Sequence, residues 1–413
     1  MAKGFVGALI AGAMLVSATA AQAAVHRVYP GDSIQAAIDM ASPGDTVLVE
    51  PGEYQESDNG RYGLRIQTDN IRLIGKVKKG RGEAGKVRLV VNQDQETGVY
   101  AAPSGCDYDV QDNTPEGIEC RSRELKGFYI RGFTVEDFPK NGIQTRWVDG
   151  FQFVSNESAR NGYDNGNGIY PTLSANGLVR DNVSYGSTDT AMWIAGSENV
   201  RVIGNELYDS VIGFEITVSN NVTVIQNEMY NNTIGVGLFH PNGAGNPPLP
   251  VMANWVIEHN DIYDNNREND APEGSLQGNL PQGIGILLSG VSDHVIAKNN
   301  VEDNDYVGIA VLGWCTGLGI ENPALCAAPP LRGSPGSTNN LVAQNYVSGN
   351  GTAPPQGALL PPADILYAQP LEQAFGIDTG GNCFEKNKPK NGFVAVSIDA
   401  FSGISDELPT DGC

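Results

Sequence analysis

The chain has 413 residues, with 48 Asp and Glu side chains against 26 Lys and Arg, and a formal net charge of −22 at pH 7. Binding to nucleic acid or to an anionic membrane surface needs a basic footprint, so this charge argues against both. The 51 glycines follow no collagen-like period and indicate many tight turns. The composition predicts an acidic, turn-rich protein that is long enough to bury a sizeable core.

Residues 1–23 have the features of a secretory signal. Lys3 supplies a positive start, an apolar stretch from Phe5 to Val16 is too short to span a bilayer, and Ala-Gln-Ala at 21–23 suits a cleavage site. The alternative is a buried N-terminal helix. We expect export, to the periplasm or outside the cell, a mature chain that starts at Ala24, and no membrane insertion.

Six cysteines, an even number in a chain expected to be exported, predict three disulfides. Six cysteines allow 15 pairings, so the sequence alone does not fix the connectivity. Metal ligation is the weaker alternative, because no Cys-x-x-Cys spacing and no clustered histidines accompany them. Proximity along the chain favours Cys106–Cys120, Cys315–Cys326 and Cys383–Cys413.

Two short patterns recur in alternation and define an internal repeat. One is an apolar residue three positions before an asparagine, and from Asn156 to Asn227 these asparagines are spaced 26, 23 and 22 residues apart. This pattern occurs at Asn156, Asn182, Asn205, Asn227, Asn260, Asn299 and Asn345. The other is Gly, once Ala, followed by an apolar residue, and it starts at Gly142, Gly168, Ala191, Gly213, Gly235, Gly283 and Gly308.

The repeat predicts an all-β solenoid. Each unit holds short alternating runs that suit β-strands, and a unit this short cannot bury its own apolar face, so the units must stack. Short parallel strands joined by turns then form a single-stranded β-helix, in which asparagines at one turn bond from coil to coil. Leucine-rich repeats lack their consensus here, and propeller blades are about twice as long.

A short helix is predicted to cap the N-terminal end. Within 30–44, Ile34, Ala37, Ile38 and Ala41 form an apolar stripe, and Ser33 or Asp32 can cap the helix. The run from Gly31 to Tyr54 resembles the N-terminal cap of secreted right-handed parallel β-helix proteins of the pectin-lyase-like superfamily. Residues 167–174 and 381–384 resemble a bacterial subgroup, the parallel β-helix repeat-containing proteins.

This resemblance covers 24–413 and implies one domain of about a dozen coils, with a C-terminal tail at about 390–413. The superfamily holds lyases, epimerases, hydrolases and non-enzymes. The chain lacks the Asn-Thr-Asp and Asp-Asp motifs of polygalacturonases and the Asp-Pro-His motif of alginate epimerases. The resemblance therefore implies a fold and leaves the activity open.

Side chains alternate along a strand, so the Gly-apolar pattern also predicts which residues point outward. Neighbouring coils lie about 4.8 Å apart, which groups Arg146, Tyr170, Trp193 and Glu215 in one patch. One outward column is predicted to contain Arg65, Tyr100, Gln144, Tyr170, Trp193, Glu215, Gly237, Gly285 and Ala310. The second is predicted to contain Gln67, Ala102, Arg146, Thr172, Ala195, Thr217, Phe239, Leu287 and Leu312.

Five inserts are expected to wall this face into a groove. Three directly follow a Gly-apolar strand, at 101–124, 241–252 and 313–338, and two directly precede one, at 266–281 and 351–373. Two of the inserts carry a cysteine pair, which would stiffen a long loop. The alternative is that these loops simply occur where a solenoid tolerates them.

Carboxylates near the groove suit glycoside hydrolysis. Asp164, Asp189 and Asp209 precede the strands, and with Glu215 they could form the acid pair that this reaction needs. The same oxygens could instead bind Ca²⁺. Each aspartate taken singly also suits an ordinary solvated turn.

A lyase is the other chemistry that the residues allow. It needs a base beside a uronate carboxylate and a cation that stabilises the enolate. Arg146 suits the cation, Tyr170 or Lys140 the base, and His240 could act as an acid or a base. We expect these side chains to carry the chemistry: Arg146, Tyr170, Glu215, Asp189 and His240. We expect these to contact substrate: Trp193, Gln144, Asp164 and Phe239.

We therefore expect an exported, monomeric β-helix protein that binds an acidic polysaccharide in a groove and cleaves it in the manner of a lyase, with Ca²⁺ as an optional cofactor. One alternative is a non-catalytic scaffold of the cell envelope or a carbohydrate-binding protein. A second is a glycoside hydrolase that uses an Asp/Glu pair.

Overall fold

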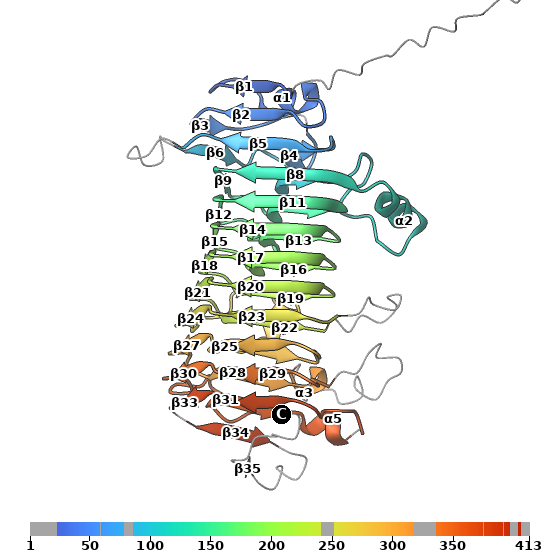
Figure 1. The fold of residues 1–413 in the computed structure, drawn as a ribbon. Coiled ribbons are helices and arrows are strands. Elements are labelled where there is room, and N and C mark those ends of the chain that lie inside the picture. The colour runs from blue at the N-terminus through green and yellow to red at the C-terminus, as the bar shows by residue number, and fades with distance from the viewer. Residues whose placement is uncertain are drawn as a thin grey trace, which may run out of the picture.

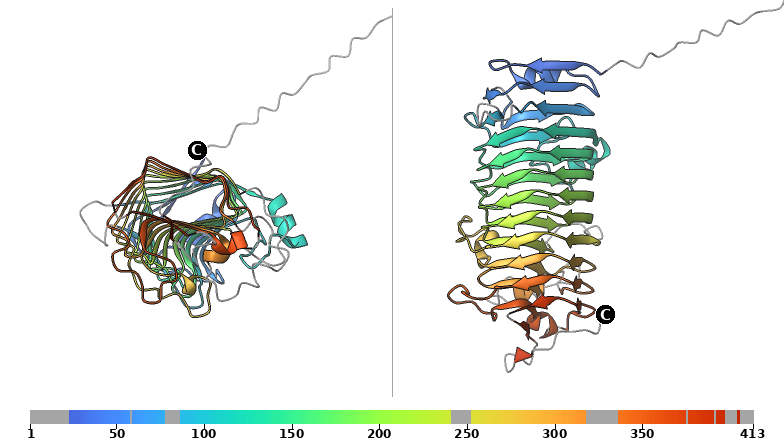
Figure 2. Two further views of the ribbon diagram at one scale, coloured as in Figure 1. Left: turned by 90° about the horizontal axis from the view of Figure 1, so that it is seen from below. Right: turned by 60° about the vertical axis from the view of Figure 1, so that its left-hand side comes forward.

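The computed structural model describes residues 23–57, 59–77, 86–240, 252–317, 336–374, 376–390, 392–396 and 404–405. All of the expected signal except Ala23 lies outside the described residues. The described chain winds into a stack of coils that runs from β1 at one end to β34 and β35 at the other (Figures 1 and 2). None of the helices in these ranges has the length and apolarity that crossing a membrane requires.

Each coil contributes strands to three long sheets, which we name A, B and C. Sheets A and C have twelve strands and sheet B has eleven, and neighbouring strands come from successive coils. The pairing is parallel except between β34 and β35. This architecture is a parallel β-helix, and the number of strands confirms the expected dozen coils.

The strand bounds follow the repeat. Sheet A contains β1 (Val25–Val28), β2 (Thr46–Val49), β5 (Ile71–Gly75), β8 (Leu125–Arg131), β11 (Val148–Val154), β14 (Ala175–Arg180), β17 (Glu198–Ile203), β20 (Asn220–Ile225), β23 (Trp255–Glu258), β26 (Val295–Ala297), β29 (Leu341–Ala343) and β32 (Cys383–Glu385). Sheet B contains β3 (Gly52–Tyr54), β6 (Val87–Val90), β9 (Phe133–Glu136), β12 (Glu157–Ala159), β15 (Val183–Tyr185), β18 (Glu206–Tyr208), β21 (Glu228–Tyr230), β24 (Asp261–Tyr263), β27 (Asn300–Glu302), β30 (Tyr346–Ser348) and β33 (Lys388–Pro389). Sheet C contains β4 (Tyr62–Ile66), β7 (Thr97–Ala101), β10 (Asn141–Arg146), β13 (Asn167–Thr172), β16 (Thr190–Ala195), β19 (Ile212–Thr217), β22 (Ile234–Phe239), β25 (Ile284–Ser289), β28 (Val307–Leu312), β31 (Ala363–Ala368), β34 (Phe393–Val396) and β35 (Ile404–Ser405).

Asparagine ladders connect the coils, as predicted. Asn182 Nδ2 donates to Asn205 Oδ1 at 2.9 Å, and Asn205 Nδ2 donates to Asn227 Oδ1 at 2.8 Å. The same bond continues through Asn260, Asn299 and Asn345 to Asn387. These side chains are buried from Asn156 to Asn345, so the ladder satisfies polar groups inside the turns.

A second ladder was not predicted from the sequence. Asn232, Asn265, Asn304 and Asn350 bond in succession, and Asp364 Oδ1 closes the series by accepting from Asn350 Nδ2 at 2.9 Å.

The N-terminal cap forms as predicted. Helix α1 (Ile34–Met40) begins after Ser33, whose hydroxyl accepts from Ala36 N at 3.0 Å. Glu56, which is buried, accepts from the Ser33 hydroxyl and from Ile34 N at 2.7 and 2.6 Å. The carboxylate thereby satisfies two donors and fixes the cap on the first coils.

The Cys106–Cys120 disulfide is confirmed, and it joins the start of the insert 101–124 to helix α2 (Pro115–Ser122). The other two expected pairings involve Cys326 and Cys413, which lie outside the described residues. So do most of the inserts 241–252 and 313–338.

Two predictions about register and inserts were wrong. Residues 351–373 do not form one insert, because strand β31 lies within them and pairs with β28. Within β25 the repeat position belongs to Gly285-Ile286 rather than Gly283-Ile284, since Val236 pairs with Ile286.

The expected tail, 390–413, lies mostly outside the described residues. Its described part contributes β34 and β35 to sheet C.

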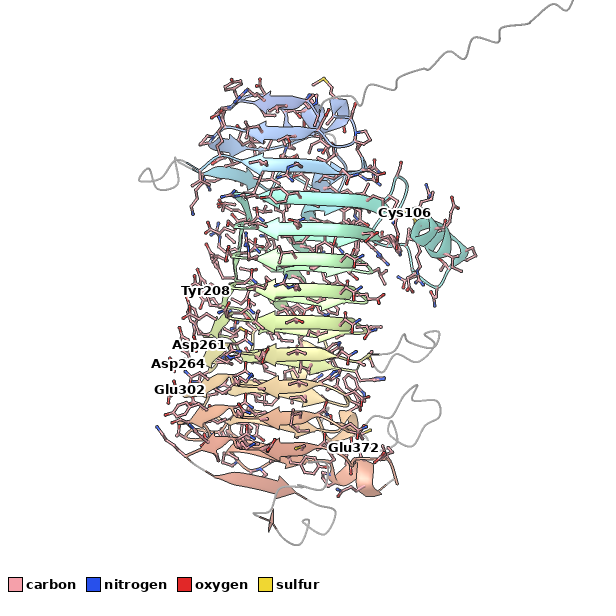
Figure 3. The ribbon with its side chains drawn as sticks, viewed as in Figure 1. Cys106, Tyr208, Asp261, Asp264, Glu302 and Glu372 are labelled. Atoms are coloured by element: carbon pink, nitrogen blue, oxygen red, sulfur yellow. A yellow bond between two sulfur atoms is a disulfide. The ribbon has the colours of Figure 1, made fainter. Side chains whose placement is uncertain are left out.

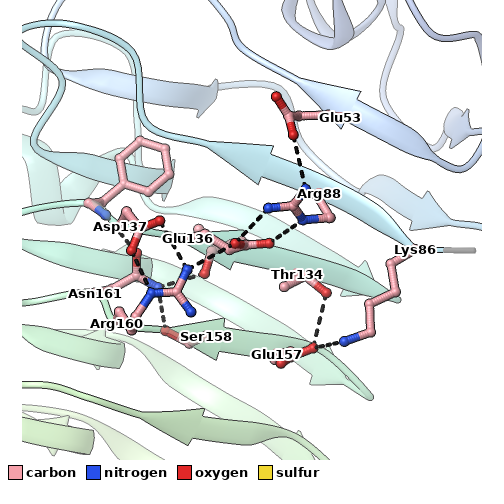
Figure 4. A network of polar contacts seen from close by, with 12 residues as sticks. Glu53, Lys86, Arg88, Thr134, Glu136, Asp137, Glu157, Ser158, Arg160 and Asn161 are labelled. Atoms are coloured by element: carbon pink, nitrogen blue, oxygen red, sulfur yellow. Dashed lines mark hydrogen bonds and ion pairs between the residues drawn. The ribbon is translucent and has the colours of Figure 1, made fainter. Parts of the chain in front are cut away.

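The outer face of sheet B carries two ordered side-chain arrays. Tyr185, Tyr208, Tyr230 and Tyr263 stack with centroid spacings of 4.9, 5.1 and 5.3 Å, so their faces are occupied by one another. Nearer the N-terminus, Glu136 pairs with both Arg88 and Arg160 in an ion network (Figure 4). Figure 3 places Tyr208 on the opposite edge of the stack from Cys106 and Glu372, which lie on the side of the inserts.

Candidate functional site

The outer face of sheet C brings the predicted patch together. Gln144 pairs with Tyr170, Trp193 pairs with Glu215, and the stacked rings of Tyr170 and Trp193 join these two pairs into one column. Arg146 lies beside Thr172 in the adjacent outward column. After Gly237 the first column continues through Leu287, Ala310 and Leu366, which corrects the expected Gly285.

The character of this face changes along the stack. Toward the N-terminus Tyr62, Tyr100 and Trp147 pack beneath the insert 101–124 with its disulfide. Toward the C-terminus an apolar cluster includes Phe239 and Leu287 and packs against Ala271, Leu280 and Leu360 of the inserts. Figure 1 shows α2 and α5 (Pro370–Ala374) projecting from the same side of the stack.

Between these two covered ends lies a polar floor. It spans β10, β13, β16 and β19, whose outward side chains include Tyr170, Trp193 and Glu215. Three strand spacings make this floor about 14 Å long. The covered ends therefore act as two walls, which we name the α2 wall (101–124) and the Gln277 wall (266–281).

Tyr170 and Trp193 stack with ring centroids 4.6 Å apart and planes 12° from parallel. Trp193 Nε1 donates to Thr217 Oγ1 at 2.9 Å, which fixes the indole. Each ring gives one face to the other, so a sugar ring would contact the edges and the remaining faces of this pair. Burial raises the pKa of Tyr170 to about 12, although the nearby Arg146 charge acts in the opposite direction.

A buried carboxyl pair lies directly beside the aromatic pair. Thr190 Oγ1 is 3.1 Å from Asp189 Oδ1 and 2.8 Å from Glu215 Oε2, so these two carboxyl oxygens lie within about 6 Å of each other. Asp189 is 4% exposed and Glu215 5%. A hydroxyl has one hydrogen to donate. Both bonds are therefore satisfied only when one carboxyl is protonated and donates to the Thr190 oxygen.

The pKa shifts of the two carboxyl groups also indicate that the pair holds one proton. Burial raises the pKa of Asp189 to about 6, while hydrogen bonds from Thr190 and Gln277 act in the opposite direction. Burial also raises the pKa of Glu215 well above its ordinary value, and the Asp189 charge raises it further. Glu215 is thus the group that keeps its proton when Asp189 ionises.

One cavity adjoins the pair, and a second cavity adjoins the first. The first has a volume of about 30 Å³ and is lined by Glu215, Gln277 and Leu276, which is enough for water but not for a sugar ring. The second has a volume of about 330 Å³ and shares Leu287 and Gly317 with the first. Its other apolar lining residues include Ile284, Val307, Ala310, Leu312, Leu360 and Leu366.

Arg146 is committed to the α2 wall. Its guanidinium donates to the carbonyl oxygens of Tyr108 and Val110 and lies 4.4 Å from the centre of the Trp147 ring. These contacts hold the wall in place. They also occupy donors that the expected role, neutralising a substrate carboxylate, would need.

The remaining expected residues are buried or paired with other protein groups. Gln144 is 1% exposed and accepts from Asn141 Nδ2. Asp164 is exposed and pairs with Lys140 at 2.8 Å. The Phe239 ring folds over Gly237, where a Cβ would lie 2.4 Å from it. His240 is buried, and its backbone N–H donates to Ser289 O at 3.2 Å.

Sequence reasoning missed Thr190 and Gln277. Thr190 stands at the same position in β16 as Asn141 in β10 and Asn167 in β13. This row of polar residues was the signal that the sequence offered. Gln277 comes from a loop whose path has no repeat to predict it. In the described ranges, no three His, Cys, Asp or Glu side chains are grouped so that they could hold a metal ion.

Comparison with known proteins agrees with the observed architecture. The family model for a right-handed β-helix region matches residues 141–325, and no curated protein sequence matches the chain. The A-module of mannuronan C-5 epimerase AlgE4 from Azotobacter vinelandii is similar with a TM-score of 0.60 and 18% identity, over 88% of this chain and 83% of that one. The AlgE6 A-module of the same organism gives 0.53 and 18%, over 88% and 94%. The Dettilon tailspike protein gives 0.53 and 13%, over 90% of this chain and 62% of that one. These likenesses show a right-handed parallel β-helix.

Proposed function

We propose that this chain, which has the right-handed parallel β-helix fold of the pectin-lyase-like superfamily, is an exported enzyme that binds a polysaccharide on sheet C and hydrolyses it. The observation that carries the proposal is the buried Asp189–Glu215 pair, bridged by Thr190, next to the Tyr170–Trp193 rings. Paired carboxyls of unequal pKa are the groups that glycoside hydrolysis needs.

Binding to a polysaccharide rests on the shape and chemistry of the floor. A rigid row of outward side chains between two walls suits an extended polymer, and aromatic side chains beside polar groups suit sugars. The two similar A-modules are named as mannuronan epimerases, so this fold serves polysaccharide chemistry elsewhere. The Cys106–Cys120 disulfide suits an exported protein, since disulfides persist in oxidising compartments.

The reaction follows from the two carboxyl groups. Protonated Glu215 donates its hydrogen to the glycosidic oxygen, the bond from that oxygen to the anomeric carbon breaks, and the leaving sugar departs as an alcohol. Ionised Asp189 adds its carboxylate oxygen to the anomeric carbon as that bond breaks, because carboxyl oxygens within about 6 Å of each other leave no room for a water between acid and base. A water then adds its oxygen to the same carbon, the bond to Asp189 breaks, and Glu215, now ionised, takes the proton that this water releases. The water-sized cavity beside Glu215 lies where such a water would wait. Both carboxyl groups thereby return to their starting protonation states.

A lyase mechanism has less support. Of the two expected bases, Tyr170 has a pKa that burial raises to about 12, and Lys140 pairs with Asp164 at 2.8 Å. A lyase would also need a free cation, and the Arg146 guanidinium is bonded to two backbone carbonyls. A non-catalytic scaffold would not explain the buried pair. Burying carboxyl groups lowers stability, and a scaffold has no use for the proton that they hold.

The experiment is product analysis with purified mature protein and a panel of neutral and acidic polysaccharides. Hydrolysis predicts that new reducing ends form and that no ultraviolet absorbance from an unsaturated sugar appears. It also predicts that the Glu215→Gln variant forms no product. Absorbance from unsaturated ends would assign a lyase instead. Binding without any product would assign a scaffold.

A further inference from the structure

The walls of the groove carry an excess of acidic groups. The α2 wall contains six acidic and two basic side chains, a net charge of −4. The Gln277 wall contains three acidic and one basic, a net charge of −2. Both walls touch the floor, since Arg146 donates to the first and the second lines the cavity beside Glu215.

Every cation of the two walls and the floor already has a partner. Arg146 is the only cation on the floor strands β10, β13, β16 and β19, and two carbonyl oxygens accept from it. On the Gln277 wall, Arg267 donates through both terminal nitrogens to Asp270 at 2.6 and 2.5 Å. On the α2 wall, Arg121 pairs with Asp112 at 2.6 Å and Arg123 donates to Ser104 O at 3.0 Å.

The interior of the groove is equally unsuited to anions. Beyond the C-terminal end of the floor lies the 330 Å³ pocket, whose described lining includes Leu287, Ala310 and Leu366 and no Lys, Arg or His side chain. A carboxylate that entered it would lose water without gaining a cation, which is strongly unfavourable. The floor itself holds Asp189, whose ionised form repels a second anion.

From this distribution of charge we infer that the groove selects an uncharged polysaccharide and rejects a polyuronate. This inference rests on the proposed function and specifies its substrate class. A polyuronate carries one negative charge on every sugar, so it would meet acidic walls on both sides with no cation released to receive it. An uncharged substrate replaces the acidic one expected from the sequence. It also differs from mannuronan, the polymer in the names of the similar epimerases.

The test compares polymers that share a backbone and differ in charge. Fully methyl-esterified and de-esterified polygalacturonate form one pair, and mannan and mannuronan form another. We expect the uncharged member of at least one pair to bind at least ten-fold more tightly in low salt. The difference should narrow as salt increases, since the screening length falls to about 10 Å at 0.1 M.

A charge variant makes the test specific to the groove. Replacing Glu119, Glu268 and Glu273, all exposed, by lysine changes the summed charge of the walls from −6 to zero. This variant should bind polyuronates at least ten-fold more tightly than the wild type and uncharged polymers equally well. A control variant has the same change in net charge away from the groove, on β17, on β24 and in the turn after β14. It carries Asp181→Lys, Glu198→Lys and Asp261→Lys, all at exposed positions, and it should resemble the wild type.

The outcomes separate the inference from the function. If the wild-type protein binds and cleaves the charged member of each pair as well as the uncharged one, the inference is overturned and the enzyme remains. If the control variant gains as much as the wall variant, net charge rather than the groove is responsible, and the inference is again overturned. If no polymer of either kind binds, the proposed function falls and the inference with it.

Discussion

Replacing Asp189 by asparagine should stabilise the folded protein at neutral pH. The substitution keeps the size of the side chain and an oxygen that can accept from Thr190 and Gln277. It removes the charge that burial makes unfavourable. A residue whose loss stabilises the fold is one whose presence serves something other than stability, which is the pattern expected of an active site.

The magnitude follows from the pKa of Asp189. Burial raises it from the ordinary 3.8 to about 6, and two units correspond to about 3 kcal/mol. The folded state binds this proton more tightly than the unfolded chain does. Its contribution to stability is therefore complete below pH 3.8 and is lost as the pH rises through about 6. The asparagine variant should gain about 3 kcal/mol over the wild type at about pH 7.5 and little at about pH 4.

Urea unfolding at these two pH values measures the difference. Asp164→Asn is the matched control, because Asp164 is an exposed aspartate near the same strands, and its stability should change by less than about 1 kcal/mol. Equal or lower stability of the Asp189 variant at neutral pH would refute the reasoning. An equal gain at both pH values would show that charge is not the cause.

Three further predictions concern the ladder, the disulfide and the aromatic pair. Asn205→Ala should lower the free energy of unfolding, measured in urea, by about 4 kcal/mol, because four buried polar groups each lose a hydrogen bond. Asn387→Ala, at the end of the ladder, should lower it less. Replacing Cys106 and Cys120 by serine should remove about 3 kcal/mol of constraint on the insert and speed proteolytic nicking within 101–124, and unchanged nicking would contradict this. Trp193→Ala should weaken polysaccharide binding by about 30-fold in a titration, and Trp193→Phe, which can still stack on Tyr170, by much less.

The regular part of the fold was predictable because it repeats. A buried asparagine at each turn and a small residue where strands crowd are physical requirements of every coil, so they recur in the sequence and report the register. Gly142 illustrates the second requirement, since a Cβ there would lie 2.3 Å from the Ser158 hydroxyl. The alternation that follows placed Tyr170, Trp193 and Glu215 in one column.

The failures occurred where the repeat is interrupted. After the insert 266–281 both Gly283-Ile284 and Gly285-Ile286 fit the pattern, and only pairing with β22 distinguishes them. In strand β31 the glycine of the repeat is replaced by Asp364, so the sequence of this strand resembled that of a loop. The roles of Arg146, Thr190 and Gln277 depend on contacts with inserts or across coils, and sequence spacing carries no record of such contacts.

The most direct test of the account is the rate of reducing-end release from an uncharged polysaccharide that the wild-type protein binds, measured against pH for the wild type and for Glu215→Gln. The account predicts that activity in the wild type rises with pH through about 6 as Asp189 ionises, and then falls when Glu215 loses its proton. It predicts that Glu215→Gln loses at least about 100-fold in rate while its affinity is unchanged. A Gln variant that retains the wild-type rate, or a wild-type protein that binds the polymer and never cleaves it, would contradict the central claim.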